Sequence, residues 1–275
     1  MNSLPHVLLV TAMLLTCGAP RAQEPAASDT TLVILDQAGS DIFPTSWLTP
    51  RINAKAETLT AEQRPRSLGL MRQALVKYPA AVLKENLRKV HVLGRLEYSG
   101  VSTGGTNSRT VVYVVNNGLK QYSDRAIEGI FHAEFSSILL RNHPHLLDKA
   151  RWQQINPPGF KYLGTGGVNA IRQQKASQRL DAVMHEEGFL HQYAKADMED
   201  DFNSVAARLL VGDAVLWSLM EQHPKLQAKA ALVMDFYHKL DPAFTRERFR
   251  SFRQAEQNEP AASRIMPGDT KKNKS

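Results

Sequence analysis

The sequence predicts an α+β protein in which a small mixed sheet precedes a mainly helical C-terminal lobe. Two observations predict this class. Runs rich in β-branched residues are confined to the first 115 residues, and the long segments from residue 123 onward carry helical spacing. The chain has 275 residues, 43% of them hydrophobic, which is enough to bury one sizeable core.

Residues 1–22 are predicted to be a signal peptide or a lipoprotein leader. Val7 to Thr16 is apolar and has the length of a signal-peptide core, shorter than a membrane span. Cys17 is the only cysteine and follows Leu14-Leu15-Thr16 in a lipobox-like setting, so it is the lipidation candidate and the only expected membrane anchor. Cleavage near Ala22 is the competing interpretation. Either way we expect a secreted or periplasmic protein, lipid-anchored to the cell envelope if Cys17 is modified.

The domain itself is predicted to span residues 23–254. It begins with a short apolar strand at Thr31 to Leu35, followed by an irregular stretch with two prolines at Ile42 to Arg51. Helical spacing covers Thr60 to Tyr78 and resumes from Ala81 to Leu87.

Two strands follow these helices. Val90 to Tyr98 is rich in β-branched and apolar residues, and Arg109 to Val115 carries the clearest strand pattern of the chain. Gly100 to Ser108 is predicted to be a turn because it is rich in Gly, Ser and Thr. We expect Arg109 to Val115 to be an edge strand that pairs with an extended peptide. Its partner-binding residues would be Val111, Tyr113 and Val115.

A long helix is predicted after that strand. Ser123 or Asp124 can cap it, and Glu128 lies in its early turns, where a negative charge suits the helix dipole. It runs to about Asn142, before Pro144.

The remaining sequence is predicted to be mainly helical. Leu147 to Ala176 is rich in loops, and Gly164 to Gly167 is interpreted as a flexible loop. Residues 255–275 are polar and lysine-rich and are predicted to form a disordered basic tail. The predicted helices are Met198 to Glu221, Pro224 to Leu240 and Thr245 to Gln254.

The long helix carries a degenerate zinc-peptidase motif. In H-E-x-x-H, two His at i and i+4 share one helix face and bind zinc, while the Glu acts as general base. Here Glu134 stands in the Glu position, but Ala133 and Ser137 stand in the two His positions. Taken alone, this pattern is common in ordinary amphipathic helices.

A second segment downstream supports the interpretation of the helix as a degenerate zinc-peptidase motif. Gly188-Phe189, Tyr193-Ala194 and Glu199-Asp200-Asp201-Phe202 occur in this order, and Pro224, Lys229 and Tyr237 follow on a further helix. The order resembles the "GF…YA…EDFAE" and "P…K…Y" signatures of the bacterial zinc-binding metallopeptidases, which are gluzincin-like. The resemblance covers about Val90 to Arg250.

The resemblance implies a zincin-like fold and assigns roles to single residues. Asp200 matches the third zinc ligand, and Tyr193 matches a residue that points at the substrate oxyanion. Glu134 and Tyr193 are therefore vestigial catalytic positions, and Glu134 and Asp200 are expected to face each other. Ser204 replaces the family's second acid. The vestigial ligand positions are Ala133, Ser137 and Asp200.

No cofactor is expected, because a catalytic zinc needs about three protein ligands and both helix His are missing. A zinc site relocated to His132, His143 or His145 stays open as an alternative. His185 begins a segment that starts like the motif, but Phe189 occupies its second His position, and we interpret it as a chance match.

The charge and hydropathy of the sequence indicate which classes of partner the protein can bind. The net charge is +7, but the excess is spread along the chain without a long basic run that contains aromatics, so no nucleic-acid partner is expected. No later segment reaches the length of a membrane span. We expect a peptidase-like protein that binds a peptide or partner protein in a degenerate cleft without catalysis. The alternatives are a zinc metallopeptidase with relocated ligands and an envelope structural or interaction protein.

Overall fold

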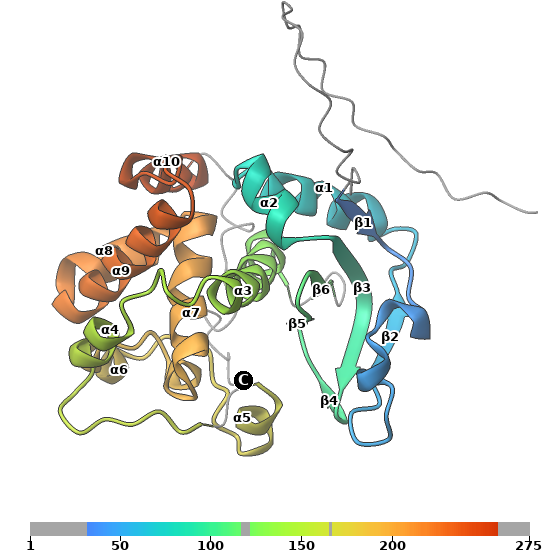
Figure 1. Cartoon of the computed structure of the whole chain (residues 1–275), viewed down its shortest axis with the longest axis horizontal. Coiled ribbons are helices and arrows are strands. Elements are labelled where there is room, and N and C mark those ends of the chain that lie inside the picture. Colours follow the sequence, from blue (N-terminus) through green and yellow to red (C-terminus); the bar gives the residue numbers. More distant parts are fainter. Residues whose placement is uncertain (1–31, 117–121, 165–166, 258–275) are drawn as a thin grey trace, which may run out of the picture. The chain divides into compact units, whose positions relative to one another are not determined.

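The computed structural model of the chain describes residues 32–116, 122–164 and 167–257. They form an α+β unit with a small open mixed sheet in the first half and helices in the second (Figure 1). The predicted leader, with Cys17, lies outside the described residues.

The sheet is ordered β1-β3-β6-β5, and β2 and β4 each pair with β3. β1, β3 and β6 run parallel, whereas β5 is antiparallel to β6 and ends the order. The strands are β1 (Val33–Leu35), β2 (Lys55–Thr58), β3 (Lys89–Tyr98), β4 (Val101–Ser102), β5 (Gly105–Asn107) and β6 (Val111–Val115).

The predicted edge strand is wrong. β6 pairs with β3 on one side and with β5 on the other, so no peptide can add to it. Val111 is half-buried, Tyr113 and Val115 are buried, and the Tyr113 hydroxyl donates to the Ile42 carbonyl at 2.6 Å. These three residues are therefore not available as a partner-binding strand. The segment that was expected to be a turn, Gly100 to Ser108, contains β4 and the edge strand β5 instead.

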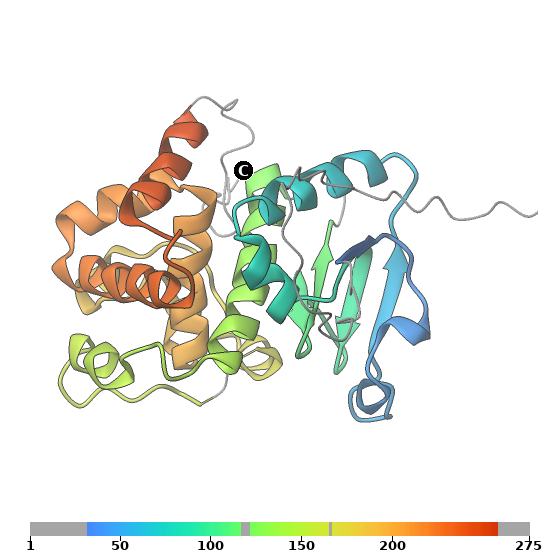
Figure 2. The same ribbon diagram turned by 45° about the horizontal axis from the view of Figure 1, so that its top comes forward.

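The two faces of the sheet pack against different layers. Val90, Val92, Val112 and Val114 belong to the larger core, which includes residues of three helices beside the sheet (Figure 2). These helices are α1 (Arg64–Leu75), α2 (Ala80–Asn86) and α3 (Asp124–Asn142). The opposite face packs against the segment with η1 (Ser40–Ile42) and η2 (Thr45–Trp47), through a smaller cluster that contains Phe43, Leu93, Leu96, Tyr113 and Val115.

The helical half packs around α7, which lies against α3. Phe202, Val205 and Leu209 of α7 are buried in the same core as Phe131 and Phe135 of α3. The remaining helices are α4 (Lys149–Ile155), α5 (Val168–Arg172), α6 (Ala182–Glu187), η3 (Gln192–Lys195), α7 (Met198–Val211), α8 (Ala214–Gln222), α9 (Pro224–Leu240) and α10 (Arg246–Gln257).

Several helix predictions need correction. The helix expected from Thr60 to Tyr78 spans Arg64–Leu75, and the segment Leu147 to Ala176, expected to be rich in loops, contains α4 and α5. The single helix expected from Met198 to Glu221 is broken, because Gly212 adopts a left-handed backbone with φ +78° and the Asp213 side chain caps α8. The last helix extends three residues beyond its predicted end at Gln254, so the predicted tail begins later; residues 258–275 lie outside the described part.

Within the described residues, no single helix is long and apolar enough to cross a membrane. The pair α7 and α8 meets the length and composition criteria only when taken together, with a bend of 120° between them.

Candidate functional site

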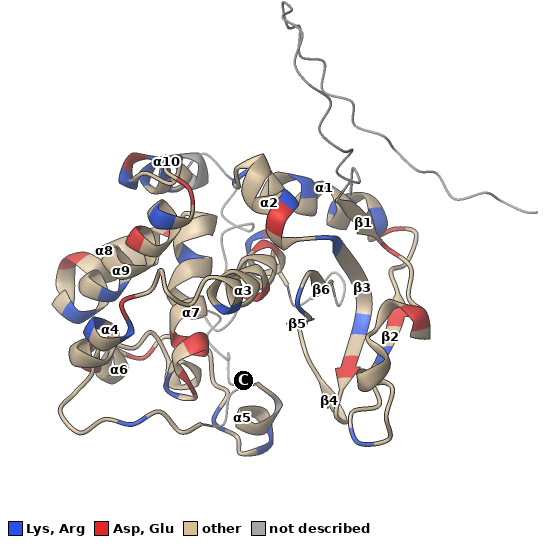
Figure 3. Cartoon of the chain, in the orientation of Figure 1, with Lys and Arg blue, Asp and Glu red and all other residues tan. Residues whose placement is uncertain are grey.

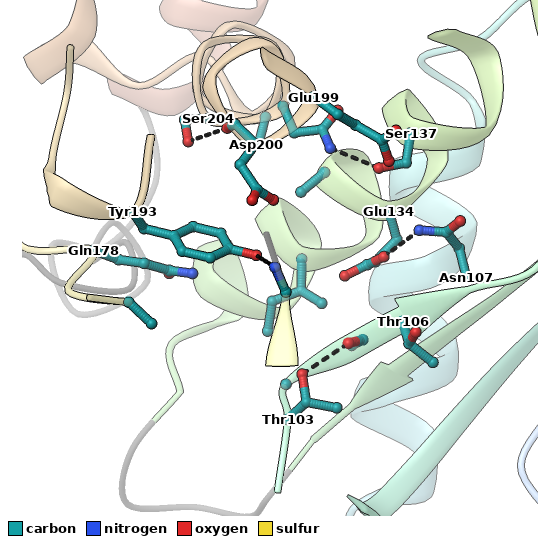
Figure 4. A pocket seen from close by; sticks show the side chains of 18 of the residues that line it. Thr103, Thr106, Asn107, Glu134, Ser137, Gln178, Tyr193, Glu199, Asp200 and Ser204 are labelled. Carbon is teal, nitrogen blue, oxygen red and sulfur yellow. Dashed lines mark hydrogen bonds between the residues drawn. The ribbon is translucent and has the colours of Figure 1, made fainter. Parts of the chain in front are cut away.

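A cavity of about 520 Å³ lies between β5, the middle of α3, η3 and the start of α7 (Figure 4). All five positions that the peptidase resemblance singles out line it. Three come from α3, one from η3 and one from α7: Ala133, Glu134, Ser137, Tyr193 and Asp200. Residues far apart in the sequence therefore meet at one place, and Figure 4 shows the Glu134 and Asp200 carboxyls directed toward the same space.

Helix α3 places three of these residues by its periodicity. Its N-terminus is capped by Ser123, whose hydroxyl accepts from the Ala126 N–H at 3.1 Å. Residues 131, 135 and 138 bury apolar side chains in the core, so residues 133, 134 and 137 face the other way, toward the cavity. The predicted bounds of this helix are confirmed, and of the two predicted caps, Ser123 and Asp124, the structure shows Ser123.

Strand β5 approaches α3 closely because it starts with glycine. A methyl group at Gly105 would lie 2.6 Å from Ile130 Cγ2 and 3.1 Å from Glu134 Cγ. Only a residue without a side chain fits there. The close approach brings the Asn107 side chain to Glu134, and Asn107 Nδ2 donates to the carboxylate at 2.5 Å.

Glu134 holds its proton more tightly than an ordinary glutamate does. Burial raises its pKa to about 7, and the hydrogen bond from Asn107 offsets part of this effect. Glu199 raises the pKa further and Arg141 lowers it. Arg141 pairs with Glu199 at 3.0 Å and also donates to the Asn107 side chain, which fixes the amide that holds Glu134.

Asp200 is perturbed in the same direction. Burial raises its pKa to about 8, and the neighbouring Asp197 adds to the shift, with smaller contributions from Glu199 and Glu134. The Tyr193 hydroxyl lowers it in part. Asp197 is held in place as the cap of α7, where its side chain accepts from the Asp200 N–H at 2.8 Å.

Tyr193 reaches the cavity from η3. Its hydroxyl accepts from the Gly167 N–H at 3.2 Å, and its pKa is raised well above the ordinary value, first by burial and then by Asp200. Tyr193 is therefore a neutral hydroxyl near two carboxyls. It has the position and the chemistry of a hydrogen-bond donor to a bound group.

The two positions at which the zinc motif has His carry small side chains here. Ser137 is buried, and its hydroxyl accepts from Asn203 Nδ2 at 2.6 Å. Ala133 offers only a methyl group. Ser204, which stands where the resembled signature has its second acid, donates to the Asp200 carbonyl at 2.6 Å.

The side chains at the two His positions of the motif cannot act as zinc ligands. A catalytic zinc takes about three N, S or O ligands in tetrahedral geometry, whereas positions 133 and 137 supply a methyl group and an engaged hydroxyl. In the described part of the chain, no group of three or more His, Cys, Asp or Glu is placed to hold a metal ion.

The histidines considered for a relocated site do not line the cavity. His132 is fully buried on the other side of α3, between the Tyr78 hydroxyl at 2.7 Å and Glu128 at 3.1 Å. His143 contacts Asn86 at 2.9 Å.

His191 does line the cavity, but it serves as a helix cap. Its Nδ1 accepts from the Ala194 N–H at 3.2 Å, at the start of η3. Burial and Arg208 lower its pKa to about 3, so the imidazole is neutral near pH 7.

Sequence reasoning missed the polar residues around the carboxyls. Asn107 and Arg141 lie outside both motifs, and Asn203 lies within the second one but at its alanine position, which assigns it no role. One available signal was the spacing of Gly105 to Asn107 from the strong strand at 111–115, which suits a hairpin with a three-residue loop.

Comparison of the chain with protein-family models, with curated proteins and with solved structures finds no match.

Proposed function

We propose that this protein is a secreted or envelope-anchored, peptidase-like protein that binds an extended peptide beside Glu134 without cleaving it. The proposal rests on the position of β5 at the edge of the described sheet, beside the cavity. Among the described strands it pairs with β6 alone, and Thr103 to Asn107 line the cavity. A peptide that adds to the outer edge of β5 would run along the cavity.

The outward-facing groups of β5 follow from its pairing with β6. The Val115 N–H donates to Gly104 and the Ser108 N–H donates to Val111, so residues 104 and 108 face β6. Because backbone groups alternate along an antiparallel strand, residues 105 and 107 direct theirs outward. A bound peptide would therefore use every second amide.

A zincin-like fold is part of this proposal. The resemblance of the motifs and the arrangement of a sheet edge, a Glu-bearing helix and an acid from a second helix all support it. Loss of the zinc donors at positions 133 and 137 supports binding over hydrolysis. No observation favours the relocated zinc site or a purely structural role in the envelope.

The test uses fluorophore-labelled, capped heptapeptides of alternating Ala and Thr, with binding measured by anisotropy and integrity measured by mass spectrometry. We expect binding without cleavage. N-methylation of the amides in one register should abolish binding, whereas N-methylation in the alternate register should leave it unchanged. Equal sensitivity in both registers, absence of binding, or cleavage of the peptide would refute the proposal.

A further inference from the structure

Two carboxyls in the cavity have no cationic partner. Glu134 and Asp200 form no ion pair with a described Lys, Arg or His, although both lie in one cavity. The two arginines that line the cavity are each engaged with another acid. Arg141 pairs with Glu199 at 3.0 Å, and Arg208 forms a buried pair with Asp213.

The same cavity holds buried acceptors without donors. Asn203 is 8% exposed; its amide nitrogen is bound to Ser137, and its Oδ1 has no hydrogen-bond partner. Asp200 Oδ2 is also buried and unpartnered. Buried polar atoms in folded proteins are nearly always satisfied, so acceptors left open at one place indicate a ligand rich in donors.

The other walls suit an organic cation better than a bare ion. The cavity of about 520 Å³ falls within the range of small-molecule pockets. Trp47 and Tyr98 line it, with ring centroids 4.9 Å apart, and Ile130 adds an aliphatic surface. Aromatic faces attract ammonium and guanidinium groups, and apolar walls cover the aliphatic part of a Lys or Arg side chain.

We propose that the cavity takes the basic side chain of the bound peptide, with Glu134 and Asp200 as its counter-charges. This inference rests on the proposed function, because the peptide on β5 delivers the side chain. Asn203 and Tyr193 complete the site as neutral hydrogen-bonding groups.

The experiment uses capped heptapeptides of alternating Ala and Thr that differ only at the central residue, which is Arg, Lys, norleucine or Glu. We expect Arg and Lys to bind at least about tenfold more tightly than norleucine, and Glu to bind most weakly. Glu134→Gln and Asp200→Asn should each remove most of the preference for Arg over norleucine. Asp235→Asn, on the outer surface of α9, is the matched control and should keep that preference.

The outcomes separate the two proposals. If no peptide binds, the proposed function fails. If norleucine binds as tightly as Arg, the peptide site stands and the basic-side-chain inference is overturned. Tight binding of Ca²⁺ or Zn²⁺ alone, lost in Asp200→Asn, with no preference for Arg, would also overturn it and make the cavity a metal site. Thermal unfolding of each variant verifies that it is folded.

Discussion

At the scale of single residues, burial of Glu134 lowers the stability of the folded chain at neutral pH. The Glu134 carboxyl has a pKa of about 7 in the folded chain, against 4.5 for an ordinary glutamate. Between these two values the folded state keeps a proton that the unfolded state has lost. The unfolding free energy must therefore fall as the pH rises from 4.5 to 7. Above pH 7 it falls no further, and the full decrease remains.

Replacing Glu134 by Gln should remove this loss. Gln keeps an oxygen that can accept from Asn107 and carries no charge at any pH. At pH 8 we expect the variant to be more stable by about 1 kcal/mol, which raises the Tm by about 2–4 °C at this chain length. At pH 4 the difference should vanish. Thermal unfolding at the two pH values measures it, and a less stable variant at pH 8 would show that the cavity favours the ionised form.

A second buried charge lies in the core behind the cavity. The Lys229 side chain is fully buried, 2.7 Å from Asp201 and 3.8 Å from the centre of the Phe189 ring. Asp201 also accepts from Tyr162 at 2.6 Å and from Trp152 at 3.1 Å. The pair links α9 to α7, the helix that carries Asp200. Removal of one partner leaves an uncompensated buried charge.

We expect Lys229→Met to cost about 3–5 kcal/mol of unfolding free energy. Adding Asp201→Asn should recover part of the loss, because Asn is neutral and its oxygen can still accept from Tyr162. The coupling should lie within about 0.5–3 kcal/mol. Urea unfolding of the two single variants and the double variant measures it. Strict additivity would mean that the two residues do not act as a pair.

At the scale of elements, the contact between β5 and α3 controls the cavity. Gly105→Ala places a methyl group 2.6 Å from Ile130 and 3.0 Å from the Tyr113 carbonyl, so strand and helix must separate. We expect a loss of about 1–3 kcal/mol, as for other overpacked sites, together with weaker peptide binding. The matched control is Gly69→Ala in α1, where nothing lies within 4 Å; it should gain up to about 1 kcal/mol. If the two variants change stability and peptide binding equally, the close contact between β5 and α3 does not control the cavity.

Strand β5 also shows which strands cannot be predicted from the sequence pattern alone. Val90 to Tyr98 and Arg109 to Val115 were predicted as strands because β-branched side chains reveal them, and β3 and β6 confirm this. β5 contains glycine, threonine and asparagine, and its position depends on space left by α3. β2 likewise lacks an apolar alternation. Local pattern therefore predicts which strands are central more readily than which strand is at the edge.

The long helices were predicted more accurately because their signals are local, whereas the short helices α4, α5 and α6 were not predicted. Ser123 caps α3, and Pro224 starts α9 where expected. The break between α7 and α8 was missed because the apolar pattern continues across Gly212. The cavity was predicted in part, because the resemblance to the metallopeptidase signatures implied that Glu134, Tyr193 and Asp200 lie together, and all three line the cavity. Of the residues that shift the pKa of Glu134, Asn107 comes from β5, which no motif covers, whereas Arg141 and Glu199 lie on α3 and α7, which carry the motifs.

At the scale of the whole molecule, the charge close to the cavity differs from the net charge of the chain. The net charge is +7, yet the first turn of α7 is acidic and lies at the cavity, whereas α10 carries four arginines (Figure 3). Charges farther apart than the screening length of about 8 Å interact little at physiological ionic strength. A basic peptide at the cavity would therefore respond mainly to the nearby carboxyls and not to the net charge.

Restoring the two motif histidines would show whether the whole cavity can support zinc chemistry. Ala133→His together with Ser137→His would rebuild H-E-x-x-H on one helix face, with both imidazoles directed into the cavity and Asp200 opposite them. The residues around the rebuilt motif would weaken zinc binding. Asp200 is one methylene shorter than the family's usual Glu, which displaces its carboxylate by about 1.5 Å. Zinc sites tolerate distance errors of only about 0.2 Å.

The network around Ser137 opposes zinc as well. A His there must displace the Asn203 amide, which now donates to the buried Ser137 hydroxyl, so the new imidazole loses the hydrogen-bonded surroundings that fit Ser137. Missing support of this kind costs about 10- to 100-fold in metal affinity. We expect the double variant to bind zinc weakly and to cleave a fluorogenic peptide little, with Asp200→Glu improving both. Ala133→His alone is the control. Robust hydrolysis by the double variant would mean that the cavity has kept its catalytic geometry and lacks only its ligands.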